Sequence, residues 1–306
     1  MPKHHWLFDN PGVAQCRILK AVMVSGLFLA LCVAGASLNG DETTGKSGGN
    51  PSESVARKKQ REENLKEMKE RAANAKVRIV SKEATSDAEL VPRALFHYTD
   101  QPRHIADATL WGWVADGRLV AACKIEKYDH QNPATQWLYC FGSLAPGLVE
   151  AEWPSGHTFS AKKPGTELAL IAVAPAPAAE RPVRLRQMKD IADHFSAVLI
   201  DATVGDTRQE MRRLPQPIYR YEMPAGDMRD GAIFGFTTNG TNPDAMLVVE
   251  LHQSGNASGK WKFSMAGMTT GGLSVKFDNE EVWSKPSVSG EVASFDTWEW
   301  FWERPK

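Results

Sequence analysis

The chain has 306 residues, 42% of them hydrophobic and 24% charged, which is an ordinary globular composition with enough apolar material for a core. Its 36 Lys and Arg against 37 Asp and Glu leave a net charge of −1, so no basic surplus favours nucleic acid, and we expect no nucleic-acid partner. None of the four cysteines lies in a C-x-x-C pair, which excludes a zinc ribbon or a thioredoxin-type motif. We predict no metal site and no cofactor.

The N-terminus has the pattern of a secretory signal peptide. A basic leader precedes the apolar run 21–33, and Ala34-Gly35-Ala36 forms an A-x-A cleavage site. We predict that residues 1–36 are a signal peptide, which places the protein in the periplasm or outside the cell with no membrane span after cleavage. The alternative is an uncleaved N-terminal membrane anchor, because the apolar stretch nearly reaches spanning length.

Residues 37–57 predict a flexible linker, since they begin with a stretch rich in Gly, Ser, Asn and Thr that is almost free of apolar side chains. Within it, residues 40–47 match the phosphate-binding loop G-x-x-x-x-G-K-[ST], with Lys46 as its lysine. That motif requires a buried strand before it and a helix after it, whereas a glycine pair and Pro51 follow here. A nucleotide-dependent protein is therefore the weakest functional hypothesis.

The remainder of the chain carries a duplication signal. Residues 95–117 and 218–240 align without a gap, with Tyr98, Asp107 and Gly112 on Tyr221, Asp230 and Gly235. An amphipathic helix predicted over about 55–79 precedes the first copy, and a similar one precedes the second.

We therefore predict two tandem repeats, residues 58–177 and 178–306. Each is expected to have an N-terminal helix followed by an antiparallel sheet of roughly six strands, which is an α+β fold. Asp116-Gly117 between two apolar runs predicts a type I′ hairpin in the first repeat.

A second hairpin is predicted between residues 119–127 and 136–142. If Glu126 lies opposite Trp137, then Cys123 meets Cys140 on the neighbouring strand. We take a cross-strand disulfide between these cysteines as a hypothesis, because an exported protein meets an oxidising compartment. Two buried free thiols are the alternative.

Asp107 and Asp230 each begin an aromatic strand, and both have two interpretations. A short acceptor at a strand start commonly bonds nearby backbone amides and fixes a turn. The functional interpretation places both carboxylates, with His97, in one ligand-binding cleft between the repeats, as an exported hydrolase would require. We expect no catalytic residue of a known motif, because G-x-S-x-G and H-E-x-x-H are absent.

Trp298, Trp300 and Trp302 alternate along a terminal segment and share one face if it is a strand. They predict either sheet core, a contact between sheets, or an exposed aromatic platform that binds carbohydrate or a protein partner.

The segment Pro215-Gln216-Pro217-Ile218-Tyr219-Arg220-Tyr221 and the Asp-Gly-Ala at 230–232 resemble a family of predicted secreted bacterial proteins of unknown function. The resemblance covers about residues 184–250 most specifically and implies export but no reaction. We predict an exported noncatalytic binding or interaction protein of unknown ligand. The alternatives are an exported hydrolase with a carboxylate site between the repeats and, less favoured, a nucleotide-dependent protein.

Overall fold

The computed structural model describes residues 51–81, 84–129, 136–201, 207–223, 227–238, 240–255, 258–288 and 294–303. The predicted signal peptide, most of the predicted linker and the phosphate-loop match at 40–47 lie outside these residues. In the part of the chain that is described, no helix is both long enough and apolar enough to cross a membrane. All of this part belongs to one compact unit, Gly49–Lys306.

Two α-helices, α1 (Pro51–Ala73) and α2 (Arg181–Asp193), are present among the described residues. Helix α1 begins at Pro51, where a proline ring suits the first helical turn, so residues 51–57 are helical and not linker. It buries Met68 and Ala72, whereas Lys66 and Glu70 form an exposed i,i+4 ion pair. The helix ends six residues before the predicted position, because residues 76–80 form a strand.

The first sheet has the strand order β18-β6-β5-β4-β2-β1-β7-β8, with β3 on the side of β4. All neighbours are antiparallel, and a short 3₁₀ turn, η1 (Gln101–Arg103), joins β3 to β4. The strands are β1 (Lys76–Val80), β2 (Thr85–Leu90), β3 (Phe96–Asp100), β4 (Ile105–Ala115), β5 (Arg118–Tyr128), β6 (Trp137–Ser143), β7 (Leu148–Glu152), β8 (Thr158–Ser160) and β18 (Trp298–Trp302).

The second sheet has the order β17-β16-β10-β11-β13-β14-β15-β9, with β12 on the side of β13. Read in reverse, this is the order of the first sheet with each strand number raised by nine, except that β9 stands in the place of β18. The strands are β9 (Ala169–Leu170), β10 (Phe195–Asp201), β11 (Thr207–Arg213), β12 (Tyr219–Glu222), β13 (Met228–Thr237), β14 (Ala245–His252), β15 (Lys260–Gly267), β16 (Gly272–Phe277) and β17 (Glu280–Lys285).

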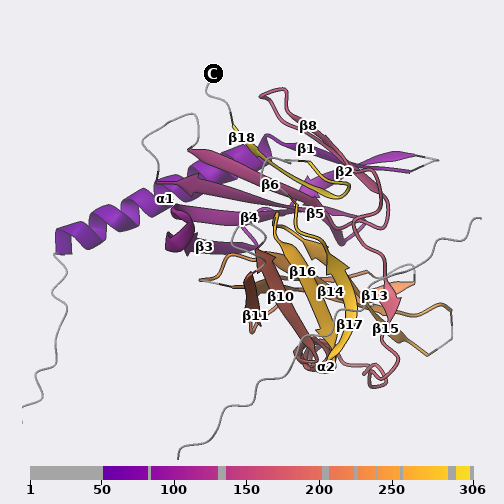
Figure 1. Ribbon diagram of the computed structural model, residues 1–306. Helices are drawn as coiled ribbons and strands as arrows, with labels where there is room; N and C mark the ends of the chain where they lie inside the picture. Colours follow the sequence, from indigo (N-terminus) through magenta and orange to yellow (C-terminus); the bar gives the residue numbers. More distant parts are fainter. Residues whose placement is uncertain are drawn as a thin grey trace, which may run out of the picture. The chain divides into compact units, whose positions relative to one another are not determined.

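The two sheets exchange their last strands. Strand β18, from the end of the chain, pairs with β6 over five residues in the first sheet, and β9, from the middle of the chain, pairs with β15 over two residues in the second. In Figure 1, β18 is yellow yet lies beside the magenta strand β6 of the first half. Each sheet is therefore completed by a segment from the other half of the sequence.

The predicted α+β class is wrong, because the fold is mostly β. Among the described residues, eighteen strands accompany only two α-helices, and each sheet has nine strands, not roughly six. The strand exchange also means that neither half is a helix leading a sheet of its own. Sequence periodicity identified the helices, but it could not reveal which strands pair over long distances.

The described residues form four buried hydrophobic clusters, of which three are large. One lies between α1 and the first sheet, and a second lies between α2 and the second sheet. The third contains residues of both sheets, such as Leu110 and Cys140 of the first and Ile233 and Met246 of the second. Strands of both sheets are thus buried on two faces, which explains the long apolar runs in β5 and β14.

The first predicted hairpin is confirmed, since Asp116 and Gly117 join β4 to β5 with φ values of 49° and 80°, as a type I′ turn requires. The predicted register of the next hairpin is wrong by one residue. Cys123 pairs with Phe141, and Lys124 pairs with Cys140. A one-residue shift turns a side chain to the opposite face of a sheet.

The disulfide hypothesis is therefore wrong. Cys123 belongs to the cluster beneath α1, whereas Cys140 belongs to the cluster between the sheets, and both are separate buried thiols. Burial raises the pKa of both thiols, so they are poor nucleophiles.

A substitution at Phe301 tests whether β18 pairs with β6 in the first sheet. The ring of Phe301 is 8% exposed and stacks on Tyr139 of β6 with centroids 4.8 Å apart. We expect Phe301→Ala to lower the free energy of unfolding by about 3–5 kcal/mol in urea titrations, because it leaves a cavity in the first core. Val173→Ala is the control, since Val173 is 76% exposed. An equally small effect of both substitutions would contradict the placement of β18.

Candidate functional site

A pocket of about 420 Å³ lies between the two sheets. Its volume is within the usual range for small-molecule sites, and both sheets contribute to its walls. The first sheet and η1 contribute Arg103, Ile105, Lys124, Glu126, Tyr128, Leu138, Cys140, Trp298, Trp300 and Trp302, and the second sheet and its adjoining loops contribute Leu199, Asp201, Asn242, Asp244, Met268, Thr269, Thr270 and Gly271.

One wall of the pocket is aromatic. Trp298, Trp300 and Trp302 all lie on the face of β18 that meets the inter-sheet cluster, which confirms that they share one face. Trp298 is 3% exposed, whereas Trp300 and Trp302 are partly exposed, and the ring of Tyr128 meets Trp302 edge to face at 5.0 Å. The row is thus a contact between sheets and a pocket wall together.

Two of these indoles have unpaired donors. The Nε1 atoms of Trp298 and Trp300 are buried and have no hydrogen-bond acceptor within the described part of the protein. A buried donor left unpaired costs about 1–3 kcal/mol. The aromatic wall therefore favours an occupant that brings hydrogen-bond acceptors as well as apolar surface.

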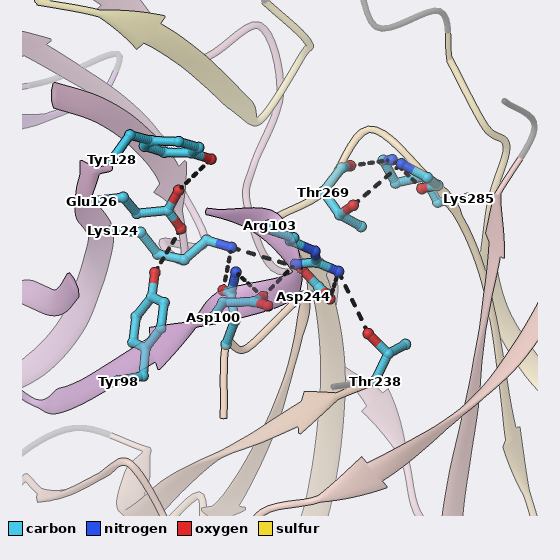
Figure 2. Close-up of polar contacts among 12 residues, drawn as sticks. Tyr98, Asp100, Arg103, Lys124, Glu126, Tyr128, Thr238, Asp244, Thr269 and Lys285 are labelled. Atoms are coloured by element: carbon cyan, nitrogen blue, oxygen red, sulfur yellow. Dashed lines mark hydrogen bonds and ion pairs between the residues drawn. The ribbon is translucent and has the colours of Figure 1, made fainter. Parts of the chain in front are cut away.

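A second part of the pocket lining is charged, and its side chains are paired with one another (Figure 2). Arg103 forms a bidentate ion pair with Asp244, through Nη1 at 2.9 Å and Nη2 at 2.8 Å. Lys124 donates to the amide oxygen of Asn242 at 2.9 Å and lies 3.8 Å from Asp244. Burial opposes the charge of Arg103, but Asp244 and Asp100 raise the pKa of the guanidinium. These contacts join the first sheet to the second.

Glu126 lines the pocket and is hydrogen-bonded to two tyrosines. It accepts hydrogen bonds from the hydroxyl groups of Tyr98 at 2.7 Å and Tyr128 at 3.3 Å, as Figure 2 shows. Burial and the charge of Glu126 raise the pKa of both phenols, so they remain donors at every physiological pH. Both acceptor oxygens of Glu126 are therefore in use.

Glu250 occupies the corresponding position in the second sheet. It accepts from Tyr221 at 2.6 Å and from His252 at 2.8 Å, and Arg118 of the first sheet reaches it at 2.8 Å. Burial opposes its ionisation, but the hydrogen bond from His252 and the charge of Arg118 hold the pKa of Glu250 below its usual value. This second buried carboxylate is thus another link between the sheets.

Lys285 holds the loop that forms the far edge of the pocket. Its ammonium donates to the carbonyl oxygens of Thr269 at 2.7 Å and Gly271 at 2.9 Å. Burial lowers the pKa of Lys285 to about 8. The two carbonyl contacts favour the protonated form, so we interpret this lysine as a clamp on the loop and not as a nucleophile.

Asp107 lies beneath α1, away from the pocket. It accepts a hydrogen bond from Asn64 of α1 at 3.0 Å and pairs with Nε2 of His97, whose Nδ1 contacts Arg61 at 2.9 Å. Burial opposes ionisation, but the hydrogen bonds from His97 and Asn64 lower the pKa of Asp107. The carboxylate therefore fastens the helix to β3 and β4.

Asp230 has the same role beneath α2 with different partners. It accepts from Nε of Arg184 in α2 at 2.7 Å and from Arg220 in β12 at 2.6 Å. The residues on its face of β13, such as Phe234, belong to the cluster under α2, just as those beside Asp107 belong to the cluster under α1. The two carboxylates thus lie on helix-covered faces with separate partners, and the structure does not bring them together with the tryptophans.

The pocket also contains residues that sequence reasoning missed. Arg103, Lys124 and Asp244 lie in three separate elements or loops, and no spacing in the sequence relates them. The one available signal was that Lys124 interrupts the apolar run 119–125, and the structure shows it 2% exposed. Over the described residues, no cluster of three His, Cys, Asp or Glu is arranged to hold a metal ion.

The two carboxylates beneath the helices provide a matched pair of tests. We expect Asp230→Asn to lower the free energy of unfolding by about 3–5 kcal/mol, because two guanidinium groups lose their buried counter-charge. Asp107→Asn should cost less, about 1–3 kcal/mol, since its partners His97 and Asn64 can be neutral. Urea denaturation at pH 7 measures both.

The cost of Asp107→Asn should also depend on pH. The folded pKa of Asp107 lies below the usual 3.8, so the unfolded state binds more protons in this range and acid removes its contribution. The difference between wild type and variant should be constant above about pH 5 and narrow as the pH falls below 3.8. If the difference grows in acid, the carboxylate is not ionised in the folded protein.

Comparisons with protein-family models, with curated proteins and with solved structures returned no match. The resemblance to secreted bacterial proteins therefore stays a prediction, and the function must be argued from the geometry of the pocket.

Proposed function

We propose that this chain is a noncatalytic binding protein whose inter-sheet pocket takes a small carbohydrate. The observation that carries the proposal is the row of Trp298, Trp300 and Trp302 along one wall of a pocket that is also lined by the Arg103–Asp244 pair. A sugar ring has apolar C–H faces that pack on indole rings, and hydroxyl groups around its rim that both donate and accept hydrogen bonds. The two walls match these two surfaces.

The size and polarity of the pocket support the same class of ligand. A volume of 420 Å³ accommodates a monosaccharide or disaccharide. Hydroxyl oxygens are acceptors for the unpaired N–H groups of Trp298 and Trp300. Because those nitrogens are buried, a ligand reaches them only after a small shift of the wall. Thr269 and Thr270 lie on the loop that Lys285 holds. Their hydroxyl groups are uncharged hydrogen-bonding groups in the pocket lining.

Binding without catalysis agrees with the state of the carboxylates. Glycoside hydrolysis requires one carboxyl group that donates a proton and a second that acts as base or nucleophile. Three carboxylates line this pocket, but both oxygens of Glu126 accept from tyrosines and Asp244 is neutralised by Arg103 and Lys124, so neither is suited to act as the second carboxyl group beside Asp201. Asp107 and Asp230, the carboxylates of the hydrolase hypothesis, are both engaged beneath the helices.

We also infer that the two halves are tandem repeats. The corresponding strand orders of the two sheets support this, as do the equivalent pairs Tyr98–Glu126 and Tyr221–Glu250. Asp107 and Asp230 fasten equivalent helices through non-identical partners. The boundaries 58–177 and 178–306 describe the repeats in sequence, although β9 and β18 cross between them in space.

Export completes the proposal, because a signal peptide over residues 1–36 would carry the protein to where free sugars are found. We expect the N-terminus of the protein purified from its native cell to be Ser37, as determined by N-terminal sequencing. An intact N-terminus in a membrane fraction would support the anchor instead, and an intact N-terminus in the cytosol would contradict export.

Tryptophan fluorescence tests the ligand class. We expect at least one sugar in a panel of mono- and disaccharides to change the emission of the wild type, with affinity confirmed by calorimetry. Trp300→Ala should weaken that binding by about tenfold or more, equivalent to 1.4 kcal/mol. Trp283→Phe is the matched control, because Trp283 is also partly exposed but lies outside this pocket.

Two outcomes would contradict the proposal. One is the absence of any response across the panel at millimolar concentration in a protein that unfolds cooperatively. The other is a sugar response that Trp300→Ala leaves unchanged while Trp283→Phe removes it.

A further inference from the structure

A second and larger hollow, of about 810 Å³, lies along the outer edge of β15. Five consecutive residues of that strand, 263–267, line it. Its other walls come from the segment before β9, from β17 and the residues after it, and from the segment before β18. We call this hollow the β15 groove.

The groove lies where the edge strand of the second sheet is shorter than its counterpart in the first sheet. In the first sheet, β18 pairs with β6 from Leu138 to Gly142, and Ser143 N–H continues the pairing by donating to the carbonyl of Thr297 at 2.9 Å. In the second sheet, β9 pairs only with Lys262 and Phe263 of β15. The rest of that edge faces the groove.

The path of the chain explains the difference. The first residues of β6 and β15 have equivalent backbone contacts. Glu303 N–H donates to the carbonyl of Trp137 beside β6, and Ile171 N–H donates to the carbonyl of Trp261 in β15, both at 3.0 Å. Further along, the segment before β9 keeps a side-chain contact with β15, because Glu167 N–H donates to the hydroxyl of Ser264 at 3.1 Å, and it then turns away, since Gly165 N–H donates to the carbonyl of Ala145 in the first half. In the first sheet Glu299 pairs with Phe141 of β6, whereas among the described residues no backbone pairing joins this segment to the equivalent residue, Met265.

Backbone alternation identifies the groups that face the groove. Trp261 directs its carbonyl outward to Ile171, and Met268 directs its N–H inward to Asp244. Along an antiparallel strand, the backbone N–H and C=O groups of successive residues point alternately to the neighbouring strands on either side. Those of Met265 and Gly267 therefore point away from β14, toward the groove. Within the described residues, no backbone partner from another segment pairs with them.

We propose that the β15 groove binds an extended acidic peptide of a partner protein, which adds a strand to the second sheet. An exposed edge supplies main-chain hydrogen bonds, and the flanking hollow takes alternate side chains of the added strand. The walls carry apolar surface from Trp283 and Phe295, which suits bulky side chains at every second position. The strand in the equivalent place, β18, has that pattern.

A small excess of positive charge in the groove favours an acidic peptide. The groove is lined by Lys162, Lys163 and Lys285 against Glu167 and Asp296. Lys162 and Lys163 are exposed, and Lys163 already contacts Asp296 at 3.5 Å, which leaves Lys162 available to a carboxylate of the partner. Complementary charge of this kind steers association and sets the register of the bound strand.

A labelled peptide with the sequence of residues 296–303 is the appropriate probe, because this acidic and aromatic segment occupies the equivalent edge of the first sheet. We expect the full-length chain to bind it in fluorescence anisotropy titrations. Hydrogen exchange should show new protection of the Met265 and Gly267 amides. Protection confined to β6 would mean that the peptide only replaces β18, and it would overturn the proposal.

Two variants separate main-chain pairing from non-specific attraction. A peptide methylated on the backbone nitrogen of its first glutamate keeps every side chain but loses an edge hydrogen bond, and we expect it to bind at least about tenfold more weakly. The double variant Lys162→Glu/Lys163→Glu should weaken binding of the unmodified peptide by a similar factor.

The control for charge is Lys66→Glu/Lys69→Glu, which reverses two exposed charges on α1, far from the groove in sequence and on another element. Equal weakening by both double variants would overturn the proposal, as would equal affinity for the methylated and unmodified peptides. Concentration-dependent dimerisation that abolishes peptide binding would assign the groove to a second copy of this chain and would also overturn it. None of these outcomes depends on sugar binding between the sheets.

Discussion

The pairing of β18 with β6 is the contact on which most of the structure depends. A strand from the very end of the chain completes the sheet that the first half begins, so the first core cannot close until the last residues are in place. On one face of β18, Phe301 fills the core beneath α1, and Glu299 accepts from His157 at 2.8 Å. On the other face, the tryptophans pack between the sheets. One five-residue strand therefore builds both a core and the wall of the pocket.

Buried carboxylates carry out the remaining long-range fastening. Asp107 and Asp230 each tie a helix to its sheet, but the partners are an amide and an imidazole in one half and two guanidinium groups in the other. Equivalent positions thus keep the same geometry with different chemistry. Between the sheets, Asp244 and Glu250 receive Arg103 and Arg118, which explains how charged side chains are tolerated in an interior surface.

Both proposed binding regions arise where the two halves differ. The aromatic strand β18 gives the first sheet a tryptophan-lined face, and this face is one wall of the pocket between the sheets. The strand β9 pairs with only two residues of β15, and the following residues of that strand line the groove. Features that the halves share, such as the tyrosine–glutamate pairs, are buried and satisfied. Divergence between the halves therefore locates the candidate sites better than their similarity does.

The sequence alone could predict those features that depend on interactions between residues close together in the chain. Positive φ at Asp116 and Gly117, the helical face containing Met68, and the common face of the terminal tryptophans all follow from interactions between near neighbours. The equivalence of Asp107 and Asp230 was also visible in the sequence.

Only the tertiary structure decided the class of the fold, the hairpin register and the composition of the pocket. The α+β prediction failed because strand exchange depends on pairing across more than 150 residues, which no local period encodes. The disulfide hypothesis failed because an apolar strand buried on both faces gives no signal of which face is which, so a register one residue away looked equally consistent. Arg103 and Asp244 are 141 positions apart, and their meeting follows only from the packing of one sheet on the other.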